Sequence, residues 1–468
     1  MALEEIRKAK LEKLENIKKA GIDPYPAESF RSHRVSEALE NFDQLSESGE
    51  KIILTGRLMS LREHGSSTFG DLKDESDKIQ LFLKKDIVGD KDYDFFVENF
   101  DIGDFIEANG VLIKTKVGEQ TLEIQSYRML TKTLLPLPEK WHGLQDVEER
   151  FRKRHLDLIF NQEAKEKFKL RFKIIQRIRE YFLKAGAIEV ETPILQIIPG
   201  GALAKPFKTH LNTLDLDLYL RVAPELFLKR LLIGGFEKVF EIGRNFRNEG
   251  IDRDHNPEFT MLEAYFAYKD YNWLMEFTED LFIYLNKDFK KPFKREKFIE
   301  LLKKETGLDY DNDTEKDFKK FAEKSGIKVE KEMTKANLAD EIFKKLIKPK
   351  LINPTFVIDH PVDLSPLAKK ISDKNVARFQ LIAGGFELTN AFSELNDPID
   401  QKERFEEQKK LKGDEVHPYD KDFLEALEYG MPPAAGIGIG IDRLVMFLTN
   451  SANLKEIIFF PIMKPRDG

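Results

Sequence analysis

An arginine-rich segment lies between two predicted strands near the middle of the chain. The segment, GRNFRNEGIDRDHNPEF, is too polar for a core, whereas the residues on both sides have the apolar patterns of strands. Its cationic side chains, together with one arginine just upstream, are Arg221, Arg244, Arg247, Arg253 and His255. Arginine binds phosphates and carboxylates through several N–H groups at once, so the set predicts an anion-binding hairpin. One such arginine taken alone is more often part of a surface ion pair.

Acidic and amide side chains gather in a second segment, GGFELTNAFSELNDP, where Glu387, Asn390, Glu394 and Asp397 lie within eleven residues. Alternation along a strand places Asn390, Phe392 and Glu394 on one face. Carboxylates on such a face can bind Mg²⁺ through their oxygen atoms, or they can bind a cationic substrate. The pattern by itself leaves both possibilities open.

Three glycines at alternate positions, Gly436, Gly438 and Gly440, interrupt a strand pattern close to the C-terminus. Glycine inside a strand indicates that another group approaches the backbone closely. Asp442 and Arg443 follow at the start of a predicted helix. The spacing resembles a dinucleotide-binding loop only superficially, because no third glycine follows at the required place, and we discount that interpretation.

The elements that must position these residues belong to a large α/β region. Apolar residues at steps of three and four predict a long helix over residues 163–185, and AIEVETPIL after it predicts a short strand. The apolar face of this helix suits either the domain core or an interface between subunits. Residues from about 287 to 350 are rich in Lys and Glu and predict a helical insertion.

The preceding region has a different pattern, with period-two runs and glycines at the turns. The runs are Ile52–Leu61, Phe69–Leu72, Ile79–Leu83, Phe105–Lys114 and Thr121–Ser126. With a helix over Asp92–Phe100, they predict a five-stranded Greek-key β-barrel, a fold that often binds oligonucleotides. Arg62, Phe69, Gln80 and Glu119 are residue types that stack on bases or bind their edges, although each alone is more often an ordinary strand residue.

Composition shifts divide the chain into an N-terminal extension (1–50), the barrel (51–143) and the large region (144–468), with a boundary in the proline-containing LLPLPEKWHG. The extension begins with an amphipathic helix. This helix either binds RNA through its basic residues or is solvated or packed on a partner. The basic residues are Arg7, Lys8, Lys10, Lys13, Lys18 and Lys19.

The composition excludes several classes of protein. With 468 residues, 41% of them hydrophobic and 34% charged, the chain is neither collagen-like nor wholly disordered. It contains no cysteine, which excludes disulfides, thiolate zinc sites and cysteine nucleophiles. No run of about 18 apolar residues could cross a membrane, and the charged N-terminus is not a signal peptide. The net charge of −7 gives no sign of a nucleic-acid partner.

Three segments resemble, in order, the signature motifs of class II aminoacyl-tRNA synthetases: GAIEVETPIL, FRNEGIDRDHNPEFTMLEAY and GIGIGIDRLVMFL. Three others resemble bacterial lysyl-tRNA synthetases: PGGALAKPF, RVAPELFLKRLLIGGFEKVFEIGRNFRNEG and NAFSELNDP. The resemblance covers nearly the whole chain. It implies an α+β fold with an OB-fold barrel that binds the anticodon, an antiparallel-sheet catalytic domain flanked by helices, and a homodimer built partly on the first motif.

The resemblance also implies a two-step reaction in the cytoplasm, with Mg²⁺ and no membrane partner. L-lysine and ATP give lysyl-adenylate and pyrophosphate, and the lysyl group then passes to the 3′ end of tRNA(Lys). The first step is an in-line attack of a carboxylate on the α-phosphate. It needs positive charge around the phosphorus and alignment of two reactants, and no nucleophilic side chain.

Residue roles follow from the matching motif positions. Arg247 is expected to bridge the lysine carboxylate and the α-phosphate, and Arg443 to hold the γ-phosphate. The other implied ATP-binding residues are Glu249, His255, Asn256, Phe259 and Glu387. The implied lysine-binding residues are Gly201, Glu225, Arg247, Glu263, Tyr265, Asn390, Phe392 and Glu394. The implied anticodon-binding residues are Arg62, Phe69, Gln80 and Glu119. Carboxylates, an amide and aromatic rings in the pocket favour lysine over aspartate or asparagine.

One position departs from the family pattern. The family has a second metal-binding Glu seven residues before Glu387, whereas this chain has Gln380, whose amide oxygen can bind Mg²⁺ but brings no charge. Three alternatives stay open: another amino-acid specificity, a lysine-ligating paralogue that acts on a translation factor, and a catalytically silent relative that binds RNA. For the insertion, a peripheral subdomain is favoured over direct contact with tRNA.

Overall fold

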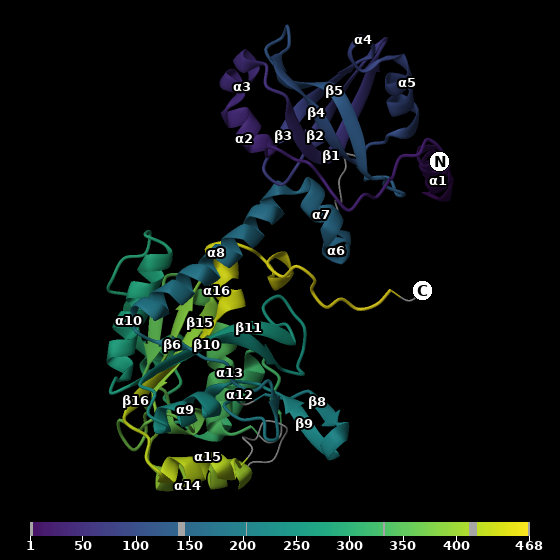
Figure 1. The fold of residues 1–468 in the computed structure, drawn as a ribbon. Helices are drawn as coiled ribbons and strands as arrows, with labels where there is room; N and C mark the ends of the chain where they lie inside the picture. The colour runs from purple at the N-terminus through teal and green to yellow at the C-terminus, as the bar shows by residue number, and fades with distance from the viewer. Residues whose placement is uncertain (1–2, 139–145, 203, 331–332, 411–418, 467–468) are drawn as a thin grey trace. The chain divides into compact units, whose positions relative to one another are not determined.

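The computed structural model describes residues 3–138, 146–202, 204–330, 333–410 and 419–466 (Figure 1). Contacts between residues divide the chain into two compact units, Met1–Gln145 and Asp146–Gly468. Each unit has its own hydrophobic core. Among the described residues, no helix is both long enough and apolar enough to cross a membrane.

The N-terminal unit is a closed barrel in the strand order β1-β2-β3-β5-β4. Its strands are β1 (Ile52–His64), β2 (Ser67–Lys73), β3 (Lys78–Lys84), β4 (Phe105–Lys114) and β5 (Gln120–Thr131). Its helices are α1 (Leu3–Lys19), α2 (Val35–Glu40), α3 (Phe42–Ser48), α4 (Lys85–Val88) and α5 (Asp90–Asn99). The five-stranded barrel is confirmed, and α5 lies between the third and fourth strands as predicted. Alternate strand residues such as Leu54, Leu81 and Leu122 fill its interior.

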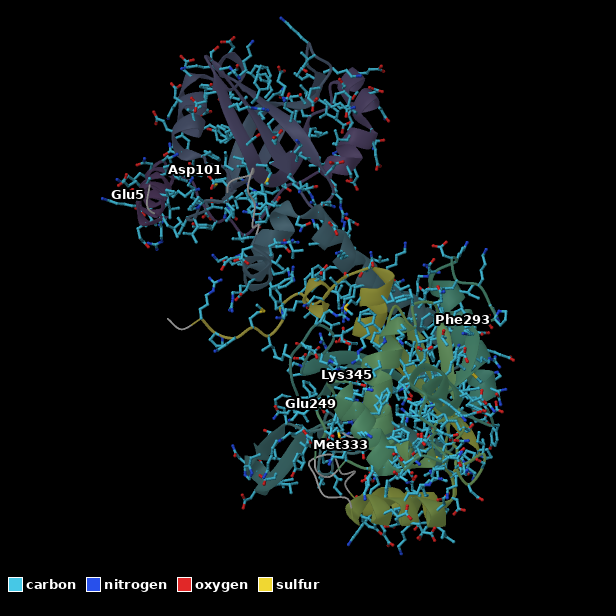
Figure 2. All side chains as sticks on the ribbon, turned by 180° about the vertical axis from the view of Figure 1, so that it is seen from behind. Glu5, Asp101, Glu249, Phe293, Met333 and Lys345 are labelled. Carbon is cyan, nitrogen blue, oxygen red and sulfur yellow. The ribbon has the colours of Figure 1, made fainter. Side chains whose placement is uncertain are left out.

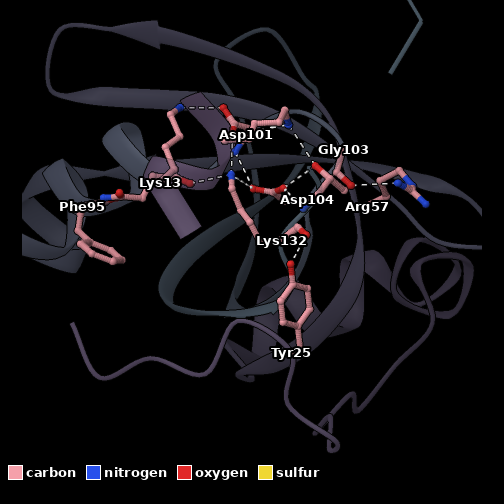
Figure 3. A network of polar contacts seen from close by, with 11 residues as sticks. Lys13, Tyr25, Arg57, Phe95, Asp101, Gly103, Asp104 and Lys132 are labelled. Atoms are coloured by element: carbon pink, nitrogen blue, oxygen red, sulfur yellow. Dashed lines mark hydrogen bonds and ion pairs between the residues drawn. The ribbon is translucent and has the colours of Figure 1, made fainter. Parts of the chain in front are cut away.

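Helix α1 contacts the barrel through a network of charged and polar side chains (Figure 3). The fully buried ammonium of Lys132 contacts Asp104 at 2.8 Å and Asp101 at 2.5 Å. From α1, Lys13 pairs with Asp101 at 2.8 Å, and Lys10 donates to Thr133 at 3.1 Å. Two of the six basic residues of this helix, Lys10 and Lys13, therefore bind the barrel.

The C-terminal unit is built on an eight-stranded sheet in the order β12-β13-β14-β15-β16-β11-β10-β6. The strands are β6 (Ile188–Glu189), β10 (Lys238–Phe246), β11 (Glu258–Ala267), β12 (Lys294–Lys297), β13 (Thr355–Ile358), β14 (Arg378–Ala383), β15 (Phe386–Ser393) and β16 (Ala434–Gly440). Neighbouring strands are antiparallel from β13 to β10, but β6 and β12 pair in parallel at the two edges. The sheet is therefore antiparallel in its centre and mixed at its edges, and the α+β class is confirmed.

Helices cover both faces of this sheet. They are α8 (Gln162–Lys184), α9 (Glu225–Ile233), α10 (Tyr271–Leu285), α14 (Pro398–Lys410), α15 (Lys421–Glu428) and α16 (Ile441–Leu448). Two short helices, α6 (Val147–Arg152) and α7 (Arg154–Phe160), precede α8 along the chain. Apolar residues of α8, α10 and α16 pack with Leu262, Ala264 and Phe266 of β11. Because strand side chains alternate, Glu263 and Tyr265 lie on the opposite face, where Tyr265 packs with α9 and α15. That face holds the candidate site.

Two smaller parts complete the unit. Strands β7 (Leu195–Gln196), β8 (Lys208–Leu211) and β9 (Leu216–Leu220) form a separate antiparallel sheet. The predicted insertion contains α11 (Phe298–Thr306), α12 (Glu315–Lys324), α13 (Lys335–Ile342) and the short turns Phe343–Ile347 and Lys348–Lys350. These helices share a small apolar core. The segment is not wholly helical, because β12 within it joins the edge of the main sheet.

Candidate active site

Strand β11 and helix α9 bring two carboxylates to one side of the sheet. Glu263 is buried, and one of its oxygens accepts a hydrogen bond of 3.0 Å from the hydroxyl of Tyr265, two residues along the same strand face. Glu225 is the first residue of α9 and is also buried. A carboxylate at a helix N-terminus is stabilised by the helix dipole. Residues about 40 positions apart in sequence therefore supply one acidic pocket.

A third carboxylate enters from the end of β15. Glu394 is buried, and its Oε2 lies 2.5 Å from the ammonium of Lys229 on α9. The same ammonium lies 2.6 Å from Oε1 of Glu225 and 5.3 Å from the ring centre of Phe392. Lys229 is fully buried, so a single cation contacts two of the three carboxylates.

Glycine backbones form two walls of this pocket. Gly201 has a φ of +88°, and a Cβ at this position would come within 2.8 Å of the Glu225 side chain. Gly436 of β16 pairs with both Tyr265 and Phe392, and a Cβ there would overlap the Tyr265 ring and Oε1 of Glu394. The predicted close approach at Gly436 is therefore a contact with the pocket side chains themselves.

The carboxylates repel each other in a dry environment. Burial raises the pKa of Glu263 to about 8, and the nearby Glu225 adds to the rise. Burial likewise raises the pKa of Glu394 to about 8, although Lys229 opposes the shift. The pKa of Glu225 is raised by burial as well. The three carboxylates share one internal cation, and a second cation would favour their ionised forms, so the pocket suits a cationic ligand.

Of the predicted arginines, Arg247 is the one best placed to bind an anion. It directly follows β10, and its backbone N–H donates to the carbonyl of Pro257, which closes the hairpin at 2.8 Å. Its guanidinium lies 5.0 Å from the ring centre of Phe259, and its buried Nε has no hydrogen-bond partner among the described residues. Burial lowers the pKa of Arg247, and Glu249 partly offsets this. An unsatisfied buried donor of this kind favours an anionic ligand.

The other predicted arginines are used for structure. Arg221 is buried in an ion pair with Glu241, and its Nε donates to the carbonyl of Arg244 at 2.9 Å. Arg244 is exposed and lies 3.6 Å from Glu258, while Arg253 lies over the ring of Phe386. The sequence pattern grouped them because they are close along the chain. Strand alternation and local ion pairs separate them in space, so the set of four is not one anion site.

Arg443 reaches the hairpin from α16, a distant part of the sequence. Its Nη2 lies 2.9 Å from Nε2 of His255, and its Nε donates to the carbonyl of Asp254. The other ring nitrogen of His255 contacts Asp252 at 2.9 Å. Asp254 first, and then Asp252, raise the pKa of His255. Arg443 can donate only to an unprotonated nitrogen, so the contact requires the neutral ring with its hydrogen on Nδ1.

The remaining residues of the loop lie near its surface. Glu249, which is labelled in Figure 2, is exposed. One of its oxygens accepts a hydrogen bond of 3.4 Å from the backbone of Lys205. The side-chain amide of Asn256 donates to the carbonyl of Glu258 at 2.5 Å and steadies the turn into β11. Both predicted ATP-binding residues therefore lie in the same loop as His255.

A β-bulge decides where Glu387 points. The register of β14 and β15 shifts so that Gln380 pairs with Asn390 and Ile382 pairs with Glu387. Directly paired residues share a face, so Glu387 lies on the face of Asn390, whereas simple alternation would place it on the other face. Asn390 also accepts a hydrogen bond of 2.8 Å from Nε of Arg378.

Gln380 lies deeper than Glu387. It is buried, and its amide oxygen lies 3.2 Å from Nε2 of His360. Burial lowers the pKa of His360 to about 3, so this ring is neutral. The amide oxygen is therefore engaged by the protein. Of the two predicted metal ligands, only Glu387 offers a partly exposed anionic oxygen.

The barrel unit has an open cavity of about 630 Å³ on one side. Arg62, Phe69 and Gln80 line it, and Phe82 stacks on Phe69 with 4.6 Å between ring centres. The hydroxyl of Thr121 donates to Gln80 at 2.9 Å, which orients the amide. Three of the four predicted anticodon residues are brought together. Glu119 does not line this cavity and is exposed in the turn before β5.

Comparison with known proteins identifies the family. A family model described as tRNA synthetases class II (D, K and N) matches residues 146–464, and one described as an OB-fold nucleic acid binding domain matches residues 52–130. The chain is 48% identical over 487 residues to a lysine–tRNA ligase of Carboxydothermus hydrogenoformans, covering 99% of each chain. The chain belongs to the lysine–tRNA ligase family.

Other members of this family are equally similar. A lysine–tRNA ligase of Thermotoga maritima is 46% identical over 488 residues, which covers 99% of this chain and 97% of the relative. One of Aquifex aeolicus is 51% identical over 437 residues, which covers 88% of this chain and 73% of the relative. The similarity therefore includes both units of this class II synthetase.

Two cations of this synthetase were not predicted from the sequence. They are the buried Lys229, which contacts Glu225 and Glu394, and the half-buried Arg378, which donates to Asn390. The spacing of Glu225 and Lys229 is a signal that could have indicated their helical pair, because residues four apart lie on one helix face. Nothing local in the sequence indicated Glu394 as the second partner.

Proposed function

We propose that this protein is a lysine–tRNA ligase. It joins L-lysine and ATP to give lysyl-adenylate and pyrophosphate, and then transfers the lysyl group to the 3′ end of tRNA(Lys). The observation that carries the proposal is the buried acidic pocket of Glu225, Glu263 and Glu394 next to Arg247. A substrate with an ammonium at each end and one carboxylate matches this distribution of charge. The family membership supports the same reaction.

In the amino-acid pocket, Glu225 and Glu263 would bind the α-ammonium, with the backbone of Gly201 close by. Glu394 and Tyr265 would bind the ε-ammonium, whose buried position requires carboxylate partners. Asn390 and Phe392 would line the aliphatic stem. An aspartate side chain in this pocket would face three carboxylates, so the site discriminates by repulsion as well as by attraction.

In the nucleotide site, Arg247 would bridge the lysine carboxylate and the α-phosphate, since it lies beside both the acidic pocket and Phe259. Phe259 would stack on the adenine, and Arg443 would bind the γ-phosphate. Glu249, His255 and Asn256 would contact the nucleotide from the loop. Fixed positive charge around the α-phosphorus stabilises the five-coordinate transition state, and the pocket holds the attacking carboxylate in line.

We further propose that Mg²⁺ binds with the ATP phosphates at Glu387. Its carboxylate is a hard oxygen ligand and faces the side of the sheet that carries Asn390. Gln380 fits a second ligand position poorly, because its oxygen already contacts His360 and carries no charge. When bound, the ion would supply positive charge to the phosphate groups as pyrophosphate leaves.

The barrel, assigned here to residues 51–143 after an N-terminal extension of 1–50, would bind the anticodon of tRNA(Lys). Exposed aromatic faces stack on unpaired bases, and Phe69 lies in the cavity with Arg62 and Gln80. Glu119 would act from the neighbouring turn. The catalytic domain is assigned to 144–468, with a peripheral insertion at about 287–350.

We also propose a cytoplasmic homodimer. Large apolar side chains of the first-motif segment are exposed in the single chain, which favours a protein interface on that surface. They are Leu170, Phe172, Leu183, Ile188, Ile194, Leu195 and Ile197. A second copy would bury them. Sedimentation of Phe172→Asp beside the unchanged protein tests this, with dissociation into monomers as the expected result.

Lysine-dependent exchange of pyrophosphate into ATP, run with each of the twenty amino acids, tests the reaction itself. We expect exchange with lysine alone, and exchange with another amino acid or with none would contradict the proposal. Phe69→Ala should leave this exchange unchanged while it raises the KM for tRNA in charging by about tenfold, as expected for loss of one base stack. Equal charging by both proteins would remove the barrel from the proposal.

A further inference from the structure

Lys229 is a buried cation that the proposed contacts of substrate leave unexplained. Its side chain is fully buried, and its ammonium lies 2.6 Å from Oε1 of Glu225 and 2.5 Å from Oε2 of Glu394. The rings of Phe392 and Phe423 lie 5.3 and 5.9 Å away. Burial of a lysine ammonium carries a desolvation cost, which attraction to charged partners offsets.

The two carboxylates bound by Lys229 are those that we assign to opposite ends of the substrate. The oxygens that Lys229 leaves free face the glycine walls of the pocket. Oε2 of Glu225 lies 3.6 Å from the place where a Cβ of Gly201 would be, and Oε1 of Glu394 lies against Gly436. Each carboxylate therefore has one oxygen on Lys229 and one toward the space for the amino acid.

We propose that Lys229 is the positioning and specificity residue of the lysine pocket: its ammonium fixes one oxygen of Glu225 and one of Glu394, and so presents a charged second oxygen of Glu394 to the ammonium of the substrate side chain. This inference rests on the proposed lysine–tRNA ligase function. It adds a protein cation that sets the spacing and the charge of two carboxylates without contacting the reacting atoms.

Charged groups from α9 and β11 surround Glu394. Glu225 from α9 and Glu263 from β11 repel its negative charge, and Lys229 attracts it. Tyr265 lies beside these carboxylates on β11 and supplies no positive charge. With Lys229 removed, Glu394 would keep a proton to higher pH. A protonated carboxyl donates a hydrogen bond and therefore accepts a neutral hydroxyl as well as it accepts an ammonium.

The test uses Lys229→Met, with lysine and 6-hydroxynorleucine as competing substrates in ATP–pyrophosphate exchange. 6-Hydroxynorleucine has the same chain with a neutral hydroxyl in place of the ε-ammonium. We expect the KM for lysine to rise by about tenfold or more while kcat changes less, and the preference for lysine to fall by a similar factor. The preference should recover only at a higher pH than the one at which the unchanged protein gains it, because loss of Lys229 raises the pKa of Glu394 further. Equal loss with both substrates, independent of pH, would overturn the inference.

Lys132→Met is the matched control, because Lys132 is also fully buried on two carboxylates but lies in the barrel unit. It should leave the preference for lysine unchanged. If Lys229→Met does not fold, the double variant Lys229→Met/Glu394→Gln replaces it, because this variant removes both charges of the Lys229–Glu394 pair. We expect the double variant to prefer lysine as strongly as the single variant Glu394→Gln does. A further tenfold loss of preference would show that Lys229 does not act through Glu394. Absence of lysine-dependent exchange in the unchanged protein would instead refute the proposed function.

Discussion

Nη2 of Arg443 lies 2.9 Å from Nε2 of His255, a contact that joins the start of α16 to a loop 188 residues earlier in the sequence. Within the described part of the chain, the guanidinium is held by one loop, to which both His255 and the carbonyl of Asp254 belong. Its remaining N–H groups could therefore bind an anion. The third motif and the second motif therefore meet at one surface, which we propose binds the phosphates of ATP.

Replacing His255 tests this contact. We expect His255→Ala to raise the KM for ATP about tenfold, because a hydrogen bond to a charged group that orients Arg443 is lost. The KM for lysine should not change, since the acidic pocket is untouched. His210→Ala is the control, because His210 is likewise exposed and paired with an aspartate, at 3.0 Å. An unchanged KM for ATP in His255→Ala would show that Arg443 needs no support from the loop.

Gly436 and Gly440 on the same strand offer a matched pair. A Cβ at Gly436 would overlap Glu394 and Tyr265, whereas a Cβ at Gly440 would lie 3.9 Å from Arg443 at ordinary contact distance. Gly436→Ala should therefore lower kcat/KM for lysine by about a hundredfold or more, since overpacking displaces the pocket carboxylate. Gly440→Ala should stay within about threefold of the unchanged protein. Similar effects of the two changes in steady-state exchange assays would contradict the assigned pocket.

Lysine binding should depend on pH in a defined direction. Burial raises the pKa of Glu263 and of Glu394 to about 8, so both are largely protonated in the empty pocket at pH 7. An ammonium binds the ionised form, so binding at pH 7 releases protons. The Kd for lysine should fall as the pH rises from 6.5 to 8.5, by up to about tenfold per unit for each group. Titration calorimetry in buffers of different ionisation enthalpy measures the released protons, and their absence would contradict the prediction.

The same carboxyl groups also affect stability. Each keeps its proton in the folded chain to about pH 8 but loses it at the ordinary value in the unfolded chain. The empty protein should therefore become less stable as the pH rises from about 4.5 to 8 through these groups. Bound lysine should remove this loss.

The buried pair of Arg171 and Asp442 positions the start of α16. Nη1 of Arg171 lies 2.6 Å from Oδ1 of Asp442, and the other oxygen of Asp442 accepts from the backbone of Thr260 at 2.8 Å. Arg171→Met leaves Asp442 charged and buried, which should lower the free energy of unfolding by about 3 kcal/mol. Lys169→Met on the same helix breaks an exposed pair and should cost less than about 1 kcal/mol. Equal denaturation midpoints for the two variants would contradict this.

Gln380→Glu tests the metal assignment. The change adds a negative charge on the face of Glu387, so we expect half-maximal adenylate formation at a lower Mg²⁺ concentration. Mn²⁺ binding in the presence of ATP, followed by electron paramagnetic resonance, gives a readout besides activity. The neutral, buried His360 at 3.2 Å would partly compete for the new carboxylate. Unchanged metal dependence and unchanged Mn²⁺ binding would show that position 380 has no part in metal binding.

The local hydrophobic pattern of the sequence was sufficient to predict the barrel. The period-two runs predicted five strands, and all five pair in a closed barrel because their alternate residues fill one interior. The strand ends were less well predicted. Strand β1 continues to His64 and β5 to Thr131, beyond the predicted ends at Leu61 and Ser126. Backbone pairing continues there, although the apolar alternation used to predict the strands has ended.

The acidic segment shows where alternation failed. Alternation placed Asn390, Phe392 and Glu394 on one face, and the same rule puts Glu387 on the other face. The bulge opposite Ile382 changes the face of Glu387, and a bulge is set by pairing with another strand. The predicted grouping of the arginines was wrong for a related reason, since Arg221 and Arg244 form ion pairs with residues of neighbouring strands.

The sequence by itself determined which chemistry is present: the barrel, the motif residues, the carboxylates for a cationic guest and the absence of any cysteine. Only the tertiary structure decided which of these residues meet. Lys229 joins Glu225 to Glu394, and Arg443 joins His255, across 165 and 188 residues of sequence respectively. The physical reason is that motif and propensity act within a few residues, whereas contacts between buried charges depend on strand order, register and the packing of helices on the sheet.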